Sequence, residues 1–478
     1  VKGEDELDIA NTLMEMGDAH SLQIQRQQNH QSTGSSSQKY TLAVEAYIEA
    51  IEIRKQVLGE HDMNVALSYY PLGMLHFKNG HRKSALECLE IALNICRVKG
   101  DFYGGNHKSA MMNVLNALGD VYYDDEDLDK AMECYEEVMQ ICQKEEEEEE
   151  DKKTNETNAC KDTSIPLRQQ ENQVKREGIV SEDHVYHQMG KIHARRQHYK
   201  EAMVSYEMAL KIRKLMLGYS HVAVARVLVD IGAIVVKDPD ASNTDEKKEQ
   251  GTENTITPTD KAIAYYEEAL RIFNIKPSLK ETELSTPHQH KHDVLLVIAN
   301  ARTVLGELYS RKQNYNKAIT NTREALLLYK RFNGETSNLS TVLHNLGTFN
   351  ARACQYDIAM KCLEEALVIR KAKSGSDSLD VARTIFEIGC VFYAEEKHDL
   401  ARDSYLESIR IWGLQPPDDK NNNLGGDDDL DLAQVKNKLG CVYGKLEQYQ
   451  EGLNYLESAL RTFKCKLGEE NDVRIATT

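Results

Sequence analysis

Histidine and cysteine, the side chains most able to carry out chemistry, are spread along this chain without a catalytic arrangement. The sixteen histidines gather only at His288, His290 and His292, in a polar segment. An alternating His-x-His-x-His sequence can bind a metal ion adventitiously, but a solvated loop explains it better. The sequence contains no glycine-rich phosphate loop and no nucleophile elbow. We therefore expect no catalytic residue, no metal site and no cofactor, and hence a protein that is not an enzyme.

The ten cysteines follow a structural spacing instead. Cys88, Cys134 and Cys362 share one position of a recurring motif, and Cys390 and Cys441 share another; no C-x-x-C pair is present. Cysteines that recur in such a register act as small packing residues rather than as metal ligands. Free thiols in this number favour a reducing compartment, so we expect a cytoplasmic protein.

A recurring glycine organises the elements that must position any site. It occurs at Gly17, Gly73, Gly119, Gly190, Gly232, Gly306, Gly347, Gly389 and Gly440. A first small residue follows at Ala43, Ala85, Ala131, Ala202, Ala262, Ala318, Ala359, Ala401 and Gly452, twelve positions later in all but the first and fifth. A second comes seven further on, at Ala50, Ala92, Val138, Ala209, Ala269, Ala325, Ala366, Ser408 and Ala459. Small residues at these spacings let two antiparallel helices touch closely, and such a hairpin must stack on copies of itself to bury its apolar face.

The spacing divides the chain into about nine hairpins with polar insertions between and within them. The expected segments are hairpins one to three in 8–143 with an insertion at 21–38, an acidic disordered linker in 144–181, hairpins four and five in 182–273 with an insertion at 238–258, a polar linker in 274–291, hairpins six to eight in 292–413, a flexible link in 414–429 and hairpin nine in 430–468. The linker opens with six glutamates, which favour a solvated chain, with a decoy that covers a basic groove as the alternative. Pro71 lies inside an expected helix and should kink or shorten it. Residues 469–478 resemble the start of a further, truncated repeat, which predicts a longer protein.

The charge balance narrows the choice of partner. Lys plus Arg number 59 and Asp plus Glu number 77, so the net charge is −18. This excess argues against nucleic acid and against an anionic membrane surface as the main partner. No apolar run reaches the length of a membrane-spanning helix, so we expect no membrane insertion.

The motif resembles the tetratricopeptide repeat. Leu118-Gly119 is followed three residues later by Tyr122, and Tyr199 precedes Ala202 by three, as in that family. A 42-residue interval and the sequence Leu217-Gly218…His221 resemble the kinesin light chain branch, which nephrocystin-like proteins share. The resemblance implies an all-α, right-handed superhelical solenoid whose first helices line a concave face. It also makes a motor or cytoskeletal complex a candidate partner, although the coiled coil by which a light chain binds its motor has no counterpart before Asp8.

The resemblance also implies which positions point inward, among them those one and five after the glycine. The position five after it holds Lys78, Asp124, Arg195, Lys237, Arg311, Arg352, Ala394 and Lys445. This basic row suits an extended acidic peptide, unless its members are only solvated helix ends. Nearby asparagines could clamp a peptide backbone or simply bridge to the next helix. The candidate peptide-binding groove is therefore Lys78, Asn113, Asn116, Lys191, Arg195, Asn300, Arg311, Asn345, Arg352, Asn437 and Lys445.

We accordingly expect a non-catalytic scaffold or adaptor that binds peptide segments of partner proteins, with a cargo adaptor like kinesin light chain as the specific form. One alternative is the sensor or autoinhibitory arm of a larger signalling enzyme, whose catalytic domain lies outside this chain. Another is an architectural scaffold that polymerises through its ends.

Overall fold

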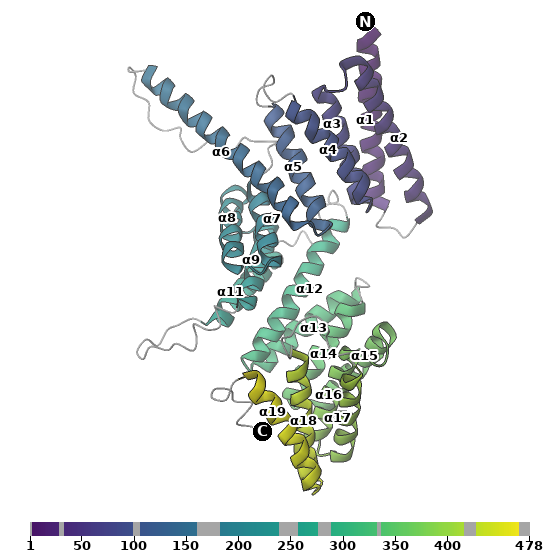
Figure 1. Ribbon diagram of the computed structural model, residues 1–478, viewed down its shortest axis with the longest axis vertical. Coiled ribbons are helices and arrows are strands. Elements are labelled where there is room, and N and C mark those ends of the chain that lie inside the picture. Colours follow the sequence, from purple (N-terminus) through teal and green to yellow (C-terminus); the bar gives the residue numbers. More distant parts are fainter. Residues whose placement is uncertain are drawn as a thin grey trace. The chain divides into compact units, whose positions relative to one another are not determined.

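The computed structural model describes residues 2–27, 33–98, 106–159, 182–238, 257–275, 288–331, 336–414 and 427–467, and every regular element in these ranges is an α-helix (Figure 1). The helices pair as α1 (Lys2–Gln27) with α2 (Thr33–Leu58), α3 (Met63–Lys78) with α4 (Arg82–Val98), α5 (Asn106–Asp124) with α6 (Leu128–Ala159), α7 (Glu182–Arg195) with α8 (Tyr199–Leu217), α9 (Val222–Lys237) with α11 (Pro258–Ile275), α12 (His288–Arg311) with α13 (Tyr315–Arg331), α14 (Thr336–Arg352) with α15 (Tyr356–Ser374), α16 (Leu379–Ala394) with α17 (His398–Gly413), and α18 (Asp427–Lys445) with α19 (Tyr449–Leu467). The expected all-α class is confirmed.

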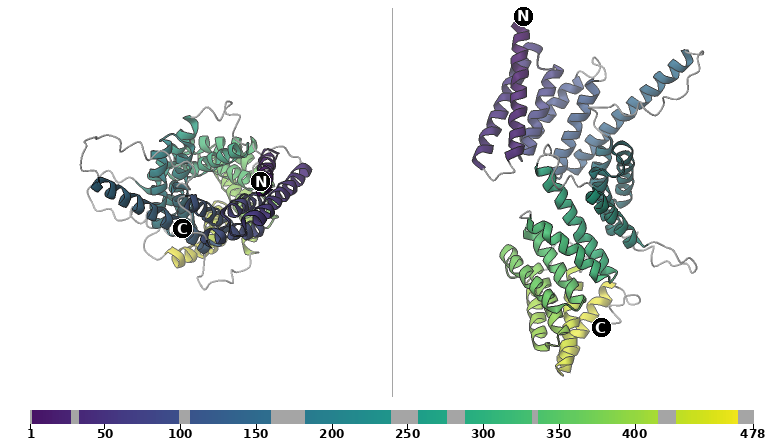
Figure 2. Two further views of the ribbon diagram at one scale, coloured as in Figure 1. Left: turned by 90° about the horizontal axis from the view of Figure 1, so that it is seen from above. Right: turned by 180° about the vertical axis from the view of Figure 1, so that it is seen from behind.

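The chain forms two compact units, Val1–Asp293 and Val294–Thr478. Within each unit a first helix packs on the second helix of its own hairpin, and that second helix packs on the first helix of the next (Figures 1 and 2). Each hairpin therefore buries its apolar face against its neighbours in sequence, as a solenoid requires. None of the described helices combines the length and the apolar character needed to span a lipid bilayer.

The recurring glycine is needed because the second helix crosses directly over it. A Cβ atom placed on Gly119 would lie 2.7 Å from the ring of Tyr135, and one on Gly347 would lie 2.6 Å from Cγ of Leu363. The same position, four after the first small residue, faces the glycine in every hairpin: Tyr47, Leu89, Tyr135, Tyr206, Tyr266, Thr322, Leu363, Tyr405 and Leu456. The small residues on either side of it, such as Ala359 and Ala366, are fully buried. The expected close packing of small residues is confirmed.

Three of the joints between hairpins share a glycine turn and an arginine, which is buried in two of them and half-buried in the third. Gly59, Gly218 and Gly375 have φ values of 93°, 81° and 82°, in the left-handed region that favours glycine. Five residues before each glycine stands Arg54, Arg213 or Arg370. Each donates from Nη1 to the carbonyl ten residues ahead, that of Asn64, Ala223 and Asp380, at 3.2, 3.1 and 2.9 Å. That carbonyl lies in the first turn of the next hairpin, so the arginine ties consecutive hairpins together.

The structure corrects several expected boundaries. The helices α1 and α2 occupy most of the insertion placed at 21–38, and α6 continues through the glutamates to Ala159, so the linker cannot begin at 144. Glutamate, glutamine and lysine are good helix formers, and a helix that is already nucleated extends through them at little cost. Residues 160–181, 239–256, 276–287 and 468–478 lie outside the described ranges.

Two further starts and one proline differ from expectation. The helix α12 begins at His288 and α18 at Asp427, so the alternating histidines open a helix rather than lie in a link. The helix α3 runs through Pro71 for 16 residues, the length of α9 and α16. The proline therefore does not shorten it. Packing of buried Ala66 and Leu72, on either side of the lost hydrogen bond, offsets that loss.

Candidate interaction face on the first helices

The first helices of consecutive hairpins lie close to one another in both units. Contacts join α1 to α3, α3 to α5 and α5 to α7 in the first unit, and α14 to α16 and α16 to α18 in the second. In the described parts of the chain, the second helices make no comparable contacts with each other. A stack whose first helices lie closer together than its second helices curves toward the first helices. The first helices therefore line the inner face of each unit, as the sequence implied.

A half-buried carboxylate joins hairpins three and four on the inner face of the first unit. Oδ1 of Asp120, one after the recurring glycine of α5, accepts from the Tyr135 hydroxyl at 2.6 Å and from Nε2 of Gln188 at 2.5 Å. Nε2 of His184 lies 3.5 Å from the same oxygen. Burial alone would raise the pKa of Asp120, but the hydrogen bonds from His184, Tyr135 and Gln188 outweigh it, and the pKa is lowered. Asp120 is therefore held as a carboxylate.

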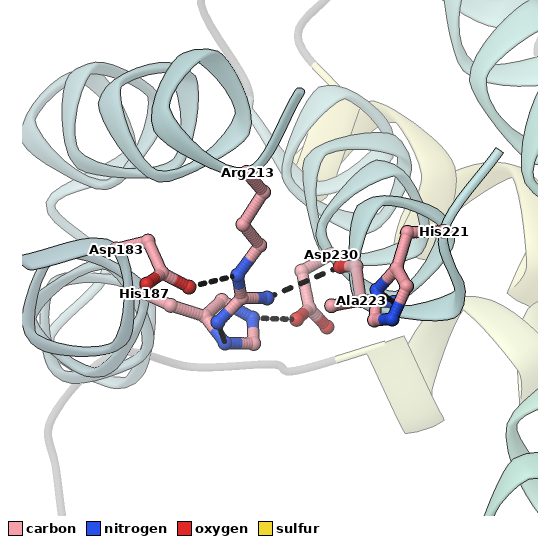
Figure 3. Close-up of polar contacts among 6 residues, drawn as sticks. All are labelled: Asp183, His187, Arg213, His221, Ala223 and Asp230. Atoms are coloured by element: carbon pink, nitrogen blue, oxygen red, sulfur yellow. Dashed lines mark hydrogen bonds and ion pairs between the residues drawn. The ribbon is translucent and has the colours of Figure 1, made fainter. Parts of the chain in front are cut away.

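A second polar network connects α7, α8 and α9 (Figure 3). Nε of Arg213 donates to Oδ2 of Asp183 at 2.5 Å, and Nη2 lies 3.4 Å from Nδ1 of His187. On the other side of the ring, Nε2 of His187 lies 2.6 Å from Oδ2 of Asp230. Burial lowers the pKa of His187 to about 4, so the ring is neutral at pH 7. Nε2–H must then donate to Asp230 while Nδ1 accepts from Arg213, which fixes the tautomer.

The predicted cations of the first unit are not all free to bind. Lys78 is exposed at the end of α3. The guanidinium of Arg195 stacks over the ring of Tyr123, 4.0 Å from its centroid, and so is already engaged. Lys191 is half-buried on α7. Burial lowers its pKa, although the negative charges of Asp230 and Asp120 act to raise it. Lys78 and Arg195 are thus exposed to solvent, whereas Lys191 is the least accessible of the three cations.

The basic row of the second unit is more open. Arg311, Arg352 and Lys445 are exposed at the ends of α12, α14 and α18. Nη1 of Arg352 reaches the Ser310 hydroxyl on the preceding first helix, at 3.4 Å. This contact places the guanidinium of Arg352 at the same end of α12 as Arg311. Of the non-basic members of the row, Asp124 of the first unit forms an ion pair with Arg82 at 2.6 Å.

The asparagines divide between the two roles that the sequence left open. Asn345 donates to Oε1 of Glu307 on the preceding first helix at 2.7 Å, and Asn300 accepts from the Tyr329 hydroxyl. These two are bridges within the fold. By contrast, Oδ1 of Asn116 and Oδ1 of Asn437 are buried and have no hydrogen-bond partner among the described residues. Asn113 is half-buried on α5.

The position two before the glycine was recognised in the sequence only at Asn345. It holds Gln188, Asp230, Asn345, Glu387 and Lys438 in five of the last six hairpins. The first three each bond to the preceding first helix, through Asp120, His187 and Glu307. The sequence did contain a signal for the other members, because polar residues recur at this position between apolar neighbours, and the motif identifies the other inward positions of the same helix.

The described residues offer little chemistry. No group of three or more His, Cys, Asp or Glu side chains in the described ranges is arranged to hold a metal ion. Burial raises the pKa of the Cys88 thiol to about 11 and that of Cys134 to about 12. Such thiols are protonated at pH 7 and pack as small apolar side chains.

A solenoid of stacked helical hairpins with a polar inner face is a scaffold for protein interactions. Family models described as tetratricopeptide repeat match residues 36–97 and 338–412, 112–148 and 184–223, and 433–462, which together make up half of the chain. The chain belongs to the tetratricopeptide repeat family.

Three known proteins show how far the similarity extends. A TPR repeat-containing protein of Dictyostelium discoideum is 24% identical over 156 residues, which cover 32% of this chain and 9% of that protein. Protein KINESIN LIGHT CHAIN-RELATED 1 of Arabidopsis thaliana is 21% identical over 201 residues, 42% of this chain and 32% of that protein. The crystal structure of BtubC (BKLC) from P. vanneervenii has a TM-score of 0.40 and 18% identity, and the match covers 57% of this chain and 94% of that one. The chain thus spans less than a third of the length of the Dictyostelium and Arabidopsis proteins.

Proposed function

We propose that this chain is a non-catalytic adaptor that binds extended, acidic segments of partner proteins along the inner face of its second unit. The observation that carries the proposal is the exposed row of Arg311, Arg352 and Lys445 on three first helices, α12, α14 and α18, of a chain whose net charge is −18; the first helix between them, α16, has Ala394 at this position. Cations gathered on one face of an acidic protein attract and orient an acidic partner.

The relation to a kinesin light chain-related protein supports a more specific form of this role. In that form the adaptor binds cargo proteins for a motor or cytoskeletal complex in the cytoplasm. A pull-down with the full-length protein, followed by mass spectrometry, tests it: recovery of motor subunits supports the role, and their absence beside other specific partners contradicts it.

Charge reversal tests the proposed binding face. The labelled probe is a synthetic 13-residue peptide of Asp, Glu, Gly and Ser, titrated by fluorescence anisotropy. The double variant Arg311→Glu with Arg352→Glu removes two attractions and adds two repulsions, so we expect affinity to fall by about 2–3 kcal/mol, roughly 30–150-fold. Raising the salt concentration should narrow this difference, because the charges are exposed.

The second helices supply a matched control. Arg323 on α13 and Lys361 on α15 are exposed, and Arg323→Glu with Lys361→Glu changes the net charge by the same amount. That variant should bind the peptide within about threefold of the parent protein, since only the bulk charge differs. Equal losses in the two variants would mean that the peptide senses net charge alone, and the proposal would be wrong.

The chain covers only a small part of the length of its curated relatives, and this favours a second candidate function. Because the match spans only 9% of the Dictyostelium protein, the repeats could serve as the sensor or autoinhibitory arm of a larger signalling enzyme. The full-length sequence separates the two functions. A nucleotide-binding P-loop domain in the same protein supports the sensor arm, and a heptad coiled coil supports the motor adaptor.

A further inference from the structure

Glu387 departs from the bonding scheme of its equivalents on the inner face. It stands two before the glycine of α16, where Gln188, Asp230 and Asn345 stand in their own hairpins. Those three bond to the preceding first helix at 2.5, 2.6 and 2.7 Å. Glu387 forms no hydrogen bond or ion pair with any described residue, although its side chain is only partly accessible to solvent. Its carboxylate therefore has unused acceptor capacity in the groove.

The two residues that would complete the scheme do not bond to Glu387. Thr348 takes the position held by Asp120 and Glu307, but its hydroxyl donates to the carbonyl of His344, in its own helix, at 3.1 Å. His344 takes the position from which His187 bonds to Asp230, yet its Nδ1 has no partner among the described residues. Among the described residues, neither Thr348 nor His344 thus connects α14 to Glu387 in the way that the equivalent residues connect α5 to α7, α7 to α9 and α12 to α14.

Cations flank Glu387 on both neighbouring first helices. Arg352 belongs to α14 and Lys438 to α18, and both are exposed. Burial raises the pKa of Glu387, while the nearby charges of Arg352 and Lys438 oppose that rise. The inner face across α14, α16 and α18 therefore presents a cation, an anion and a cation in order. A carboxylate that is partly desolvated and without a donor gains most from a charged donor that a ligand brings.

We propose that Glu387 is the specificity-determining residue that receives a lysine or arginine of the bound segment, while Arg352 and Lys438 receive acidic residues on either side of it. This inference rests on the proposed function and names the chemistry of its partner. Packed helices lie about 8–10 Å apart, and an extended chain advances about 3.3 Å per residue. The partner motif is therefore an acidic residue, a basic residue and an acidic residue at intervals of roughly three.

Two 13-residue probe peptides test the inference by fluorescence anisotropy. Both carry aspartates at positions 4 and 10 in a Gly/Ser chain; one has lysine at position 7 and the other has norleucine, a neutral side chain of similar length. The parent protein should bind the lysine peptide about tenfold more tightly. Glu387→Gln should abolish this preference and bind the norleucine peptide at least as well as the parent protein does, because a carboxylate beside the peptide's aspartates has been removed.

Glu307→Gln is the matched control. Glu307 is a glutamate of the same inner face, but its carboxylate already accepts from Asn345, so this variant should keep the tenfold preference. Thermal melts followed by circular dichroism confirm that both variants fold. Binding of both peptides with no preference in the parent protein, or a preference that survives Glu387→Gln, overturns the inference and leaves the proposed function standing. Failure of the parent protein to bind either peptide overturns both.

Discussion

Replacing Gly347 by alanine tests the packing on which the solenoid depends. The added Cβ would lie 2.6 Å from Cγ of Leu363, 2.9 Å from Cδ2 and 3.1 Å from the carbonyl oxygen of Ala359. Cγ is a branch point and the carbonyl belongs to the backbone, so neither can move aside without shifting α15 against α14. Overpacking of this kind costs about 2–3 kcal/mol, offset by about 1 kcal/mol from the better helix propensity of alanine. We expect the free energy of unfolding to fall by about 1–2 kcal/mol.

Gly444 provides the control, because it is a helical glycine at which an added Cβ would have nothing within 4 Å. Gly444→Ala should stabilise the protein by about 0.5–1 kcal/mol, so the same chemical change has opposite signs at the two sites. The assay is urea unfolding followed by circular dichroism, with hydrogen exchange of α14 and α15 to localise the effect.

A second background sharpens the test of Gly347. In a Leu363→Ala protein the two closest contacts of the added Cβ are gone and only the Ala359 carbonyl oxygen, at 3.1 Å, remains. Gly347→Ala should there be close to neutral or stabilising, a change that a double-mutant cycle measures. Equal effects of Gly347→Ala in both backgrounds, or equal effects at Gly347 and Gly444, would refute the close-contact explanation of the recurring glycine.

Two further predictions concern the joints and the effect of pH. Arg370→Met removes the donor to the Asp380 carbonyl and the Thr384 hydroxyl, so it should lower the free energy of unfolding in urea by about 1.5–3 kcal/mol. The control Lys371→Met, on the exposed side of α15, should change it by less than about 0.5 kcal/mol. A similar small effect at both positions would show that the arginine does not hold the joint. Burial lowers the pKa of His187 to about 4 in the folded protein, whereas the ordinary pKa of histidine is about 6.5. Between these two pH values the unfolded chain binds a proton on His187 and the folded chain does not. Stability that is present above about pH 6.5 is therefore lost as the pH falls toward 4. The variant His187→Gln should lose less stability over that window when urea midpoints are compared pH by pH, and parallel curves for the two proteins would contradict the assignment.

The repeat register could be predicted because it depends on side-chain size at fixed spacing. Gly347, Ala359 and Ala366 are close to each other in sequence, and their size alone dictates that two helices touch. The residue that faces the glycine, Leu363 in this hairpin, was missed because the tyrosine, leucine and threonine found at that position share neither size nor polarity. Helix ends were predicted less well: nothing in the composition of 144–159 distinguishes a solvated helix from a solvated coil, and only the nucleated turn of α6 decides between them.

The candidate binding residues could be predicted only in part. Position in the repeat told which residues face inward, and the structure places Arg311, Arg352 and Lys445 exposed on first helices. It could not tell which inward side chains already have partners. Arg195 stacks on Tyr123 from the preceding hairpin, and Asn345 bonds to Glu307, and both contacts depend on the rotation of one first helix relative to the next. Glu387 was overlooked for the same reason. Its lack of a partner becomes evident only when it is compared with the equivalent residues of other hairpins, which are hydrogen-bonded.

Photo-crosslinking tests the central claim, that partner segments bind along the first helices. An acidic 13-residue peptide with a central benzoylphenylalanine would be irradiated with the protein, and the linked residues identified by mass spectrometry. The binding proposed here predicts crosslinks on the inner positions of α12, α14, α16 and α18, lost in the Arg311→Glu, Arg352→Glu variant. Crosslinks that fall on α13, α15, α17 and α19 instead, or that persist unchanged in the variant, would contradict it.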